Sequence, residues 1–148
     1  MNSYLTIIPA FFGCLGFAMF FNMNKSHILI SAVNGAFAWF VFVLFHRMGS
    51  SLFICSLAGT LAASIGSEVL ARVKKAPSTI FYIPGIVPMV PGSNLYYMIE
   101  ALMHEDMAEA GIQAYALLWT ILGIAVGAAA VLGVIWTKRK ISVYRRNL

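Results

Sequence analysis

The sequence predicts an all-α membrane protein, a single transmembrane domain over residues 1–148 with five helices, the fourth of them broken. Of its 148 residues, 61% are hydrophobic and 10% are charged, whereas soluble domains carry about 25% charged residues. Uncharged apolar runs of about 20 residues, the length that spans a hydrocarbon core, recur along the chain. A further apolar run, IPGIVPMVPGSNLYYMIEALM, is interrupted by prolines and glycines. These observations exclude a soluble domain and predict a helical bundle.

The five spans follow one another with short connections. They are expected at residues 3–21, 27–45, 52–71, 79–103 (broken) and 114–137, followed by a basic tail at 138–148. The opening MNSYLTIIPAFF lacks the basic region of a signal peptide, so we expect the first run to be retained as a helix. Cys14 and Cys55 lie inside predicted spans, which favours a packing role over a disulfide.

The charges predict that the N-terminus lies outside and the C-terminus lies in the cytoplasm. In this orientation every Lys and Arg except Arg47 falls in a cytoplasmic segment, as the positive-inside rule requires. The fourth segment must then cross the membrane, because a re-entrant loop would export the basic tail. The acidic connection HEDMAEAG lies outside. The net charge of +5 is therefore a topology signal, the tail also suits anionic lipid, and we expect no nucleic-acid partner.

The proline-rich segment is predicted to unwind partway across the bilayer. Pro84, Pro88 and Pro91 lack an N–H and clash with the carbonyl four residues back. Gly92 would permit the backbone to turn, and Ser93 would cap a second helix. Irregular backbone at membrane depth is tolerated only against protein or a water-filled cavity. The break should therefore face inward.

The restarted helix is a predicted binding site for a carboxylate. The free N–H groups of Asn94, Leu95 and Tyr96 would lie at the positive end of a short helix, as in the discontinuous helices of secondary transporters. The alternative is a proline kink that only shapes helix packing. The predicted substrate-binding residues are Pro84, Gly85, Pro88, Pro91 and Gly92, which would set the backbone, and Ser93, Asn94 and Tyr96, which would face the ligand.

The segment IPGIVPMVPGSNLYYMIEAL resembles the proline–glycine signature of the threonine/serine exporter family, and GCLGFAMFFN is similar to the first helix of that family's small, separately encoded subunit. The resemblance covers essentially the whole chain, which looks like the C-terminal half of the fused exporters. It implies a bacterial inner-membrane protein that works with a second five-helix membrane subunit. It also implies substrates that are small amino acids, with small dicarboxylates proposed for the two-subunit exporters. An inverted-repeat pairing of the halves is a reasonable hypothesis.

Three other polar residues are candidates for ion coupling or a polar pathway. Glu68 lies four residues before Arg72, so an interfacial pair and a proton-coupling role compete as explanations. Glu100 is an acid near the outer end of its span, where it either functions or simply reaches water. Asn34, inside the second span, bonds either a neighbouring helix or a substrate.

Small residues recur at four-residue spacing, which lets membrane helices approach closely. They are Gly59, Ala63 and Ser67 in the third span, and Gly123 and Gly127 in the fifth. This spacing predicts seams within the subunit or between subunits, and it leaves a higher oligomer open.

Signatures of soluble enzymes are absent from the sequence: it has no H-E-x-x-H, no Walker A lysine loop, no G-x-S-x-G and no Cys/His cluster with metal spacing. We therefore expect no enzymatic activity, no cofactor and no metal. Transport would be driven by an ion gradient, by the gradient of the substrate or by another subunit. The sequence favours a subunit of a secondary exporter, and the alternative is a non-transporting membrane scaffold or assembly subunit.

Overall fold

The computed structural model describes the backbone of residues 3–146 and the side chains of residues 5–133. The elements in chain order are η1 (Ser3–Thr6), α1 (Ile7–Phe20), α2 (Lys25–Arg47), α3 (Leu52–Lys74), α4 (Ser78–Ile86), η2 (Val87–Met89), α5 (Gly92–Met103) and α6 (Met107–Arg146), where η marks a 3-10 helix. The described chain is thus all-helical, as predicted. Within it, α2, α3 and the Met107–Gly133 part of α6 are long and apolar enough to cross a membrane, whereas α1 and α4 with η2 form shorter apolar helices.

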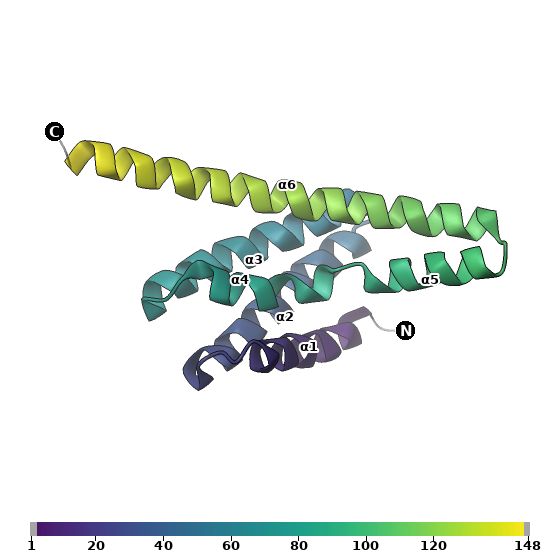
Figure 1. Ribbon diagram of the computed structural model, residues 1–148, viewed down its shortest axis with the longest axis horizontal. Coiled ribbons are helices and arrows are strands. Elements are labelled where there is room, and N and C mark those ends of the chain that lie inside the picture. The colour runs from purple at the N-terminus through teal and green to yellow at the C-terminus, as the bar shows by residue number, and fades with distance from the viewer. Residues whose placement is uncertain (1–2, 147–148) are drawn as a thin grey trace.

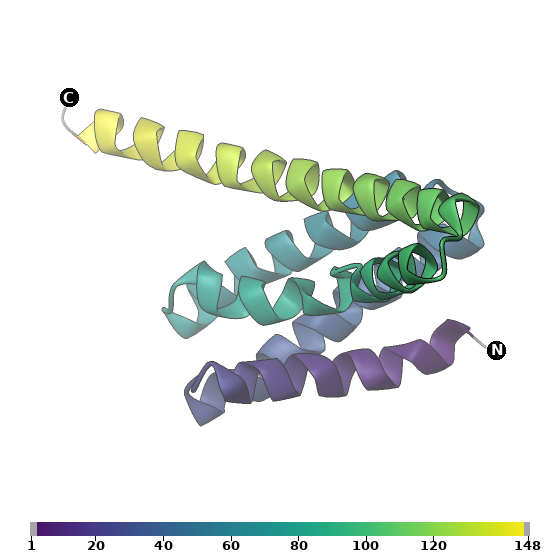
Figure 2. The ribbon, with the colours of Figure 1, turned by 45° about the vertical axis from the view of Figure 1, so that its right-hand side comes forward.

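The helices form a layered bundle. α2, α3 and α4 pack against one another in its centre, with α6 on one side and α1 on the other (Figure 2). α6 packs along α3, and α1 packs along α2. α5 packs mainly on α6, and together they project beyond the central helices (Figure 1). The face of α5 that points away from α6 is therefore left open.

The connections gather at two ends of the bundle (Figure 1). The turns α1–α2 and α3–α4 lie at the same end as the C-terminus of α6, and the turns α2–α3 and α5–α6 lie at the other end. The first end carries exposed Lys25, Lys74 and Lys75. The second end carries exposed Glu105 and Asp106. Apart from exposed Arg47, the last residue of α2 at the second end, the basic and acidic residues of the connections are therefore separated along the long axis.

Side-chain caps fix where α2 and α3 begin. Asn24 Oδ1 accepts a hydrogen bond of 3.3 Å from the backbone N–H of Ser26, and Ser51 Oγ accepts one of 3.5 Å from Ile54. Each cap satisfies an N–H that has no partner within its helix. α3 ends at Lys74, because the next residue, Lys75, adopts a left-handed conformation with φ of 51°.

α6 is longer than predicted. The connection expected at residues 104–113 is wrong, because α6 already begins at Met107. Asp106 Oδ1 accepts a 3.1 Å hydrogen bond from the N–H of Glu109, which is the capping geometry of a helix start. The helical backbone continues to Arg146, through most of the segment expected to be a tail. Side chains after Gly133 lie outside the described residues.

Small residues bring α6 against α3. A Cβ added to Gly123 would overlap Ser56 Oγ, and one added to Gly127 would lie 3.0 Å from Thr60 Cβ. The small-residue spacing in the fifth span is therefore an intramolecular seam. On the other side of α3, a Cβ on Gly59 would lie 2.6 Å from the sulfur of Met89 in η2. α3 therefore packs against α6 and η2 through close contacts at small residues.

Candidate functional site

The proline-rich segment is interrupted at one place only. Pro84 is accommodated inside α4, and Pro88 lies in η2. The helical backbone stops after Met89 and resumes at Gly92, and Val90 between them is extended, with φ of −61° and ψ of 121°. The ring of Pro91 disfavours helical geometry at the preceding residue, which explains why Val90 is extended. The unwound stretch is shorter than expected from three prolines.

The restart of the helix differs from the prediction. α5 begins at Gly92, one residue before Ser93, and no side chain caps it. Gly92 is not among the described glycines with positive φ, and a Cβ added there would meet nothing within 4 Å. The turn therefore does not depend on the freedom of glycine. The N–H of Leu95 already donates to Pro91 O at 3.2 Å, so the prediction of a free N–H at Leu95 is wrong.

The three residues expected to face a ligand do not face a common space. Ser93 and Tyr96 are exposed, and 65% of Tyr96 is accessible. Asn94 is half-buried, and its Nδ2 donates a 3.1 Å hydrogen bond to Gln113 Oε1 on α6. Gln113 Nε2 in turn donates to Glu109 Oε1 at 2.7 Å. The Asn94 side chain therefore ties α5 to α6.

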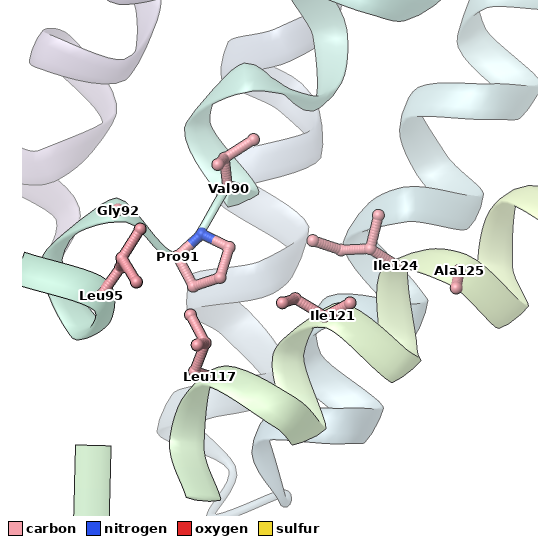
Figure 3. Close-up of a pocket in the computed structure, with 8 residues that line it drawn as sticks. All are labelled: Val90, Pro91, Gly92, Leu95, Leu117, Ile121, Ile124 and Ala125. Atoms are coloured by element: carbon pink, nitrogen blue, oxygen red, sulfur yellow. The ribbon is translucent and has the colours of Figure 1, made fainter. Parts of the chain in front are cut away.

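A groove of about 330 Å³ lies beside the interruption, between the α4–α5 junction and α6 (Figure 3). It is lined by Val90, Pro91, Gly92, Leu95, Leu117, Ile121, Ile124 and Ala125. Two of the predicted site residues, Pro91 and Gly92, contribute to it. The lining side chains are all apolar, so any charge on a ligand here must be met by backbone groups or by another chain.

Pro84 and Gly85 lie elsewhere, in the centre of the bundle, and both are buried. A Cβ on Gly85 would lie 2.9 Å from Asn34 Nδ2, and a Cβ on Gly35 would lie 3.3 Å from Gly85 Cα. These glycines let α2 and α4 cross closely. The predicted site residues are thus divided among the core, the groove and the exposed face of α5.

Asn34 joins α2 to α3. Its Nδ2 donates 3.1 Å hydrogen bonds to Ala63 O and to Ser67 Oγ. The amide is 6% exposed and fits beside Gly66 and Gly85, where a Cβ on either would collide with it. Of the two alternatives that the sequence left for Asn34, the structure shows the bond to a neighbouring helix.

A second cavity of about 30 Å³ lies between α3, α4 and α6, and most of the residues that line it carry polar side chains; it is called the polar cavity below. Its lining consists of Ser64, Ser67, Glu68, Ser78, Thr79, Tyr82, Val131 and Leu132. Glu68 is half-buried there, whereas Glu100 is exposed on α5. Sequence reasoning found Glu68 but missed the hydroxyls around it. The available signal was the four-residue spacing of Ser56, Thr60, Ser64 and Glu68, which places a polar stripe along α3.

Comparison of the chain with known proteins identifies its family. No curated protein and no solved structure matches the chain. Residues 6–134 match the family described as "Threonine/Serine exporter, ThrE". The match spans most of the chain and includes both the α4–α5 junction and the polar cavity. Together with the long apolar helices it identifies a multi-pass membrane protein of an amino-acid transporter class. The chain therefore belongs to the threonine/serine exporter family, as a component of an exporter.

Proposed function

We propose that this chain is one subunit of a two-subunit secondary exporter in the bacterial inner membrane, working with a second five-helix membrane subunit. Its substrates are small amino acids such as threonine and serine, or small dicarboxylates. Membership of the exporter family supports the transport of amino acids. The carboxylate that these substrates share is the group to be recognised.

In this proposal the chain crosses the membrane five times, with its N-terminus outside. α1 supplies one crossing beyond the three long helices, and α4, η2 and α5 together supply the other. The separation of the two ends supports the orientation, because exposed Lys25, Lys74 and Lys75 share one end. The positive-inside rule assigns that end to the cytoplasm.

The observation that carries the proposal is the interruption at Pro91 on an exposed surface. Val90 is 60% exposed, and Gly92 and Ser93 are exposed as well. Because lipid cannot satisfy irregular backbone, this stretch must face protein or water. The first turn of a helix that starts at Gly92 leaves the N–H groups of Ser93 and Asn94 without helical partners. These two N–H groups, at the positive end of α5, bind the substrate carboxylate.

The second subunit completes the site. α5 contacts mainly α6, and Tyr96 and Ile99, which do not line the groove, are exposed. The apolar groove supplies no charged side chain for the amino group or second carboxylate of a substrate, so the partner must supply it. Glu100, exposed one turn after Tyr96, contributes a polar pathway in the space between the subunits.

The test is exchange of labelled substrate across vesicles that contain both subunits. Wild-type protein should exchange internal unlabelled serine, threonine or succinate for the labelled compound outside. Gly92→Leu should abolish this exchange while the protein still inserts and purifies with its partner, because the added side chain covers the first turn of α5. Gly111→Leu is the matched control, since a Cβ there also meets nothing within 4 Å.

Two results would contradict the proposal. Absence of exchange of all three compounds by the wild type would overturn the assignment as an exporter of these substrates. Release of the partner by Gly92→Leu before any loss of exchange would favour the alternative, a scaffold whose junction is only a docking surface.

A further inference from the structure

The polar cavity around Glu68 is separate from the α4–α5 junction and is built by two helices that face each other. α3 contributes Ser64, Ser67 and Glu68. α4 contributes Ser78, Thr79 and Tyr82, and α6 contributes Val131 and Leu132. One carboxylate residue and five hydroxyl-bearing residues therefore line one small space, beside the apolar Val131 and Leu132.

The size of the cavity limits its occupant. A volume of about 30 Å³ holds one or two water molecules or a single ion. A whole amino acid or dicarboxylate does not fit. The groove at the α4–α5 junction, at about 330 Å³, is the space of suitable size for a metabolite. The occupant of the Glu68 cavity is therefore something other than the transported substrate.

Hydrogen bonding in α3 determines which charge the cavity accepts. Ser64 Oγ donates to Thr60 O at 2.7 Å, and Ser67 Oγ donates to Ala63 O at 2.7 Å. Because both hydroxyl hydrogens are committed to the helix backbone, these oxygens offer lone pairs to other partners. Ser67 Oγ already accepts from Asn34 Nδ2 at 3.1 Å. In a cavity that Glu68 also lines, such acceptor oxygens suit a cation and disfavour an anion.

We propose that the Glu68 cavity binds the small monovalent cation that drives export, either a proton carried on the carboxylate or Na⁺ held by the oxygens. This inference rests on the function proposed above. Isolated acids inside membrane proteins are costly and mark ion or proton pathways, and a bound cation compensates the carboxylate charge.

Three other charged or titratable side chains belong to this part of the bundle. Tyr82 lines the cavity, Arg72 lies one turn after Glu68 on α3, and His27 of α2 packs edge-on against Phe81 of α4.

The position of the cavity connects it to the substrate groove. A cation held between α3 and α4 fixes one helix against the other, because Glu68 lies on α3 and three of the lining hydroxyls lie on α4. α4 continues through η2 directly to the interruption at Pro91. Thr60, one turn before Ser64 on α3, contacts the sulfur of Met89 in η2 at 3.9 Å. Loss of the cation therefore allows α4 and the junction to move together, which is the differential binding that coupling requires.

The experiment separates coupling from substrate exchange in vesicles that contain both subunits. Exchange with equal cation concentrations on both sides tests the transport function alone. Accumulation against a substrate gradient is then driven by an imposed pH gradient or, in a separate arm, by a Na⁺ gradient. Glu68→Gln should keep exchange and lose accumulation by about tenfold or more. Glu105→Gln, an exposed acid in the α5–α6 turn, is the control and should keep both activities.

The outcomes distinguish the two proposals. The arm that drives the wild type, and fails to drive Glu68→Gln, identifies the cation. Accumulation by Glu68→Gln at the wild-type level overturns the inference, as does loss of accumulation in Glu100→Gln but not in Glu68→Gln. Failure of the wild type to accumulate under either gradient, with exchange intact, also overturns it. Absence of exchange in the wild type instead overturns the proposed function.

A second variant keeps the test valid if Glu68→Gln does not insert or loses exchange as well. Tyr82→Phe removes one lining hydroxyl and leaves the carboxylate in place. It should raise the cation concentration that half-saturates accumulation, while exchange continues. An unchanged half-saturating concentration contradicts the inference.

Discussion

Asn34 Nδ2 on α2 lies 3.1 Å from Ser67 Oγ on α3, and Ser67 belongs to the lining of the Glu68 cavity. This hydrogen bond joins the small-residue core of the bundle to its polar cavity. Because Asn34 also donates to Ala63 O, it binds two groups of the same helix turn. The stability of the bundle and the geometry of the cavity therefore share one side chain.

We expect this bond to appear as coupling in a double-mutant cycle. Asn34→Ala should destabilise the protein more than Ser67→Ala, since Asn34 loses both of its acceptors. The coupling energy between the two sites should be about 0.6 kcal/mol and at most about 1.7 kcal/mol, the range measured for hydrogen bonds between membrane helices. The measurement is denaturant unfolding of each variant and of the double variant in detergent micelles. Strict additivity would contradict a direct bond.

The close packing of Gly66 against Asn34, compared with the open space beside Gly16, predicts different outcomes for substitution of these two glycines. Gly66→Ala places a methyl group onto Asn34 Oδ1 and should lower the free energy of unfolding by about 1–3 kcal/mol. Gly16→Ala adds its methyl to open space in α1, so alanine's better helix propensity should leave stability unchanged or raise it by up to about 1 kcal/mol. Thermal unfolding of both variants in detergent checks the contrast. Equal melting temperatures of the two variants would show that the space between Gly66 and Asn34 tolerates a methyl group.

The bond between Asn94 and Gln113 predicts local stability at the projecting α5–α6 pair. Gln113→Ala removes the acceptor and should speed amide hydrogen exchange in α5, with little change in α2 and α3. Ser93→Ala is the control, because Ser93 is exposed and does not cap α5. Exchange followed by mass spectrometry gives the rates. Uniform acceleration across all helices would show global destabilisation instead.

The separation of charge between the two ends predicts an accessibility pattern. A membrane-impermeant maleimide should label Glu105→Cys in intact cells with a permeabilised outer membrane, and label Lys75→Cys only after the inner membrane is opened. The native Cys14 and Cys55 are 0% exposed and should remain unlabelled under both conditions, which supplies an internal control. Labelling of Lys75→Cys from outside would reverse the proposed orientation.

Local sequence signals predicted the local features of the fold. Apolar runs located the helices, and Pro91 located the one interruption, because a proline constrains the residue before it regardless of the rest of the chain. The cap of α5 was predicted at Ser93, two residues after the observed N-cap position, because Ser93 is a favourable cap but Pro91 already supplies a suitable φ before the helix. The early start of α6 was missed because an acidic, polar segment looks like a loop when its Asp106 cap is not considered.

The arrangement of the candidate site depended on packing that one sequence does not specify. Pro84 and Gly85 share a motif with Pro91, yet they serve the crossing of α2 and α4, which depends on Gly35 about fifty residues earlier. The hydroxyls of Ser78 and Thr79 meet Glu68 only because α4 folds back along α3. Spacing along α3 could have indicated one wall of this cavity, but not the opposite one.

The hydroxyls of α3 also bear on how the protein is made. Ser56 Oγ bonds to Leu52 O at 2.7 Å, as Ser64 and Ser67 bond to carbonyls one turn earlier in the same helix. A helix whose serine hydroxyl hydrogens are satisfied internally enters the bilayer at lower cost than one in which they need partners from neighbouring segments. The segment can thus leave the translocon before α4 and α6 have been synthesised. The remaining lone pairs of the serine oxygens then accept hydrogen bonds from other helices, as Ser67 Oγ does from Asn34.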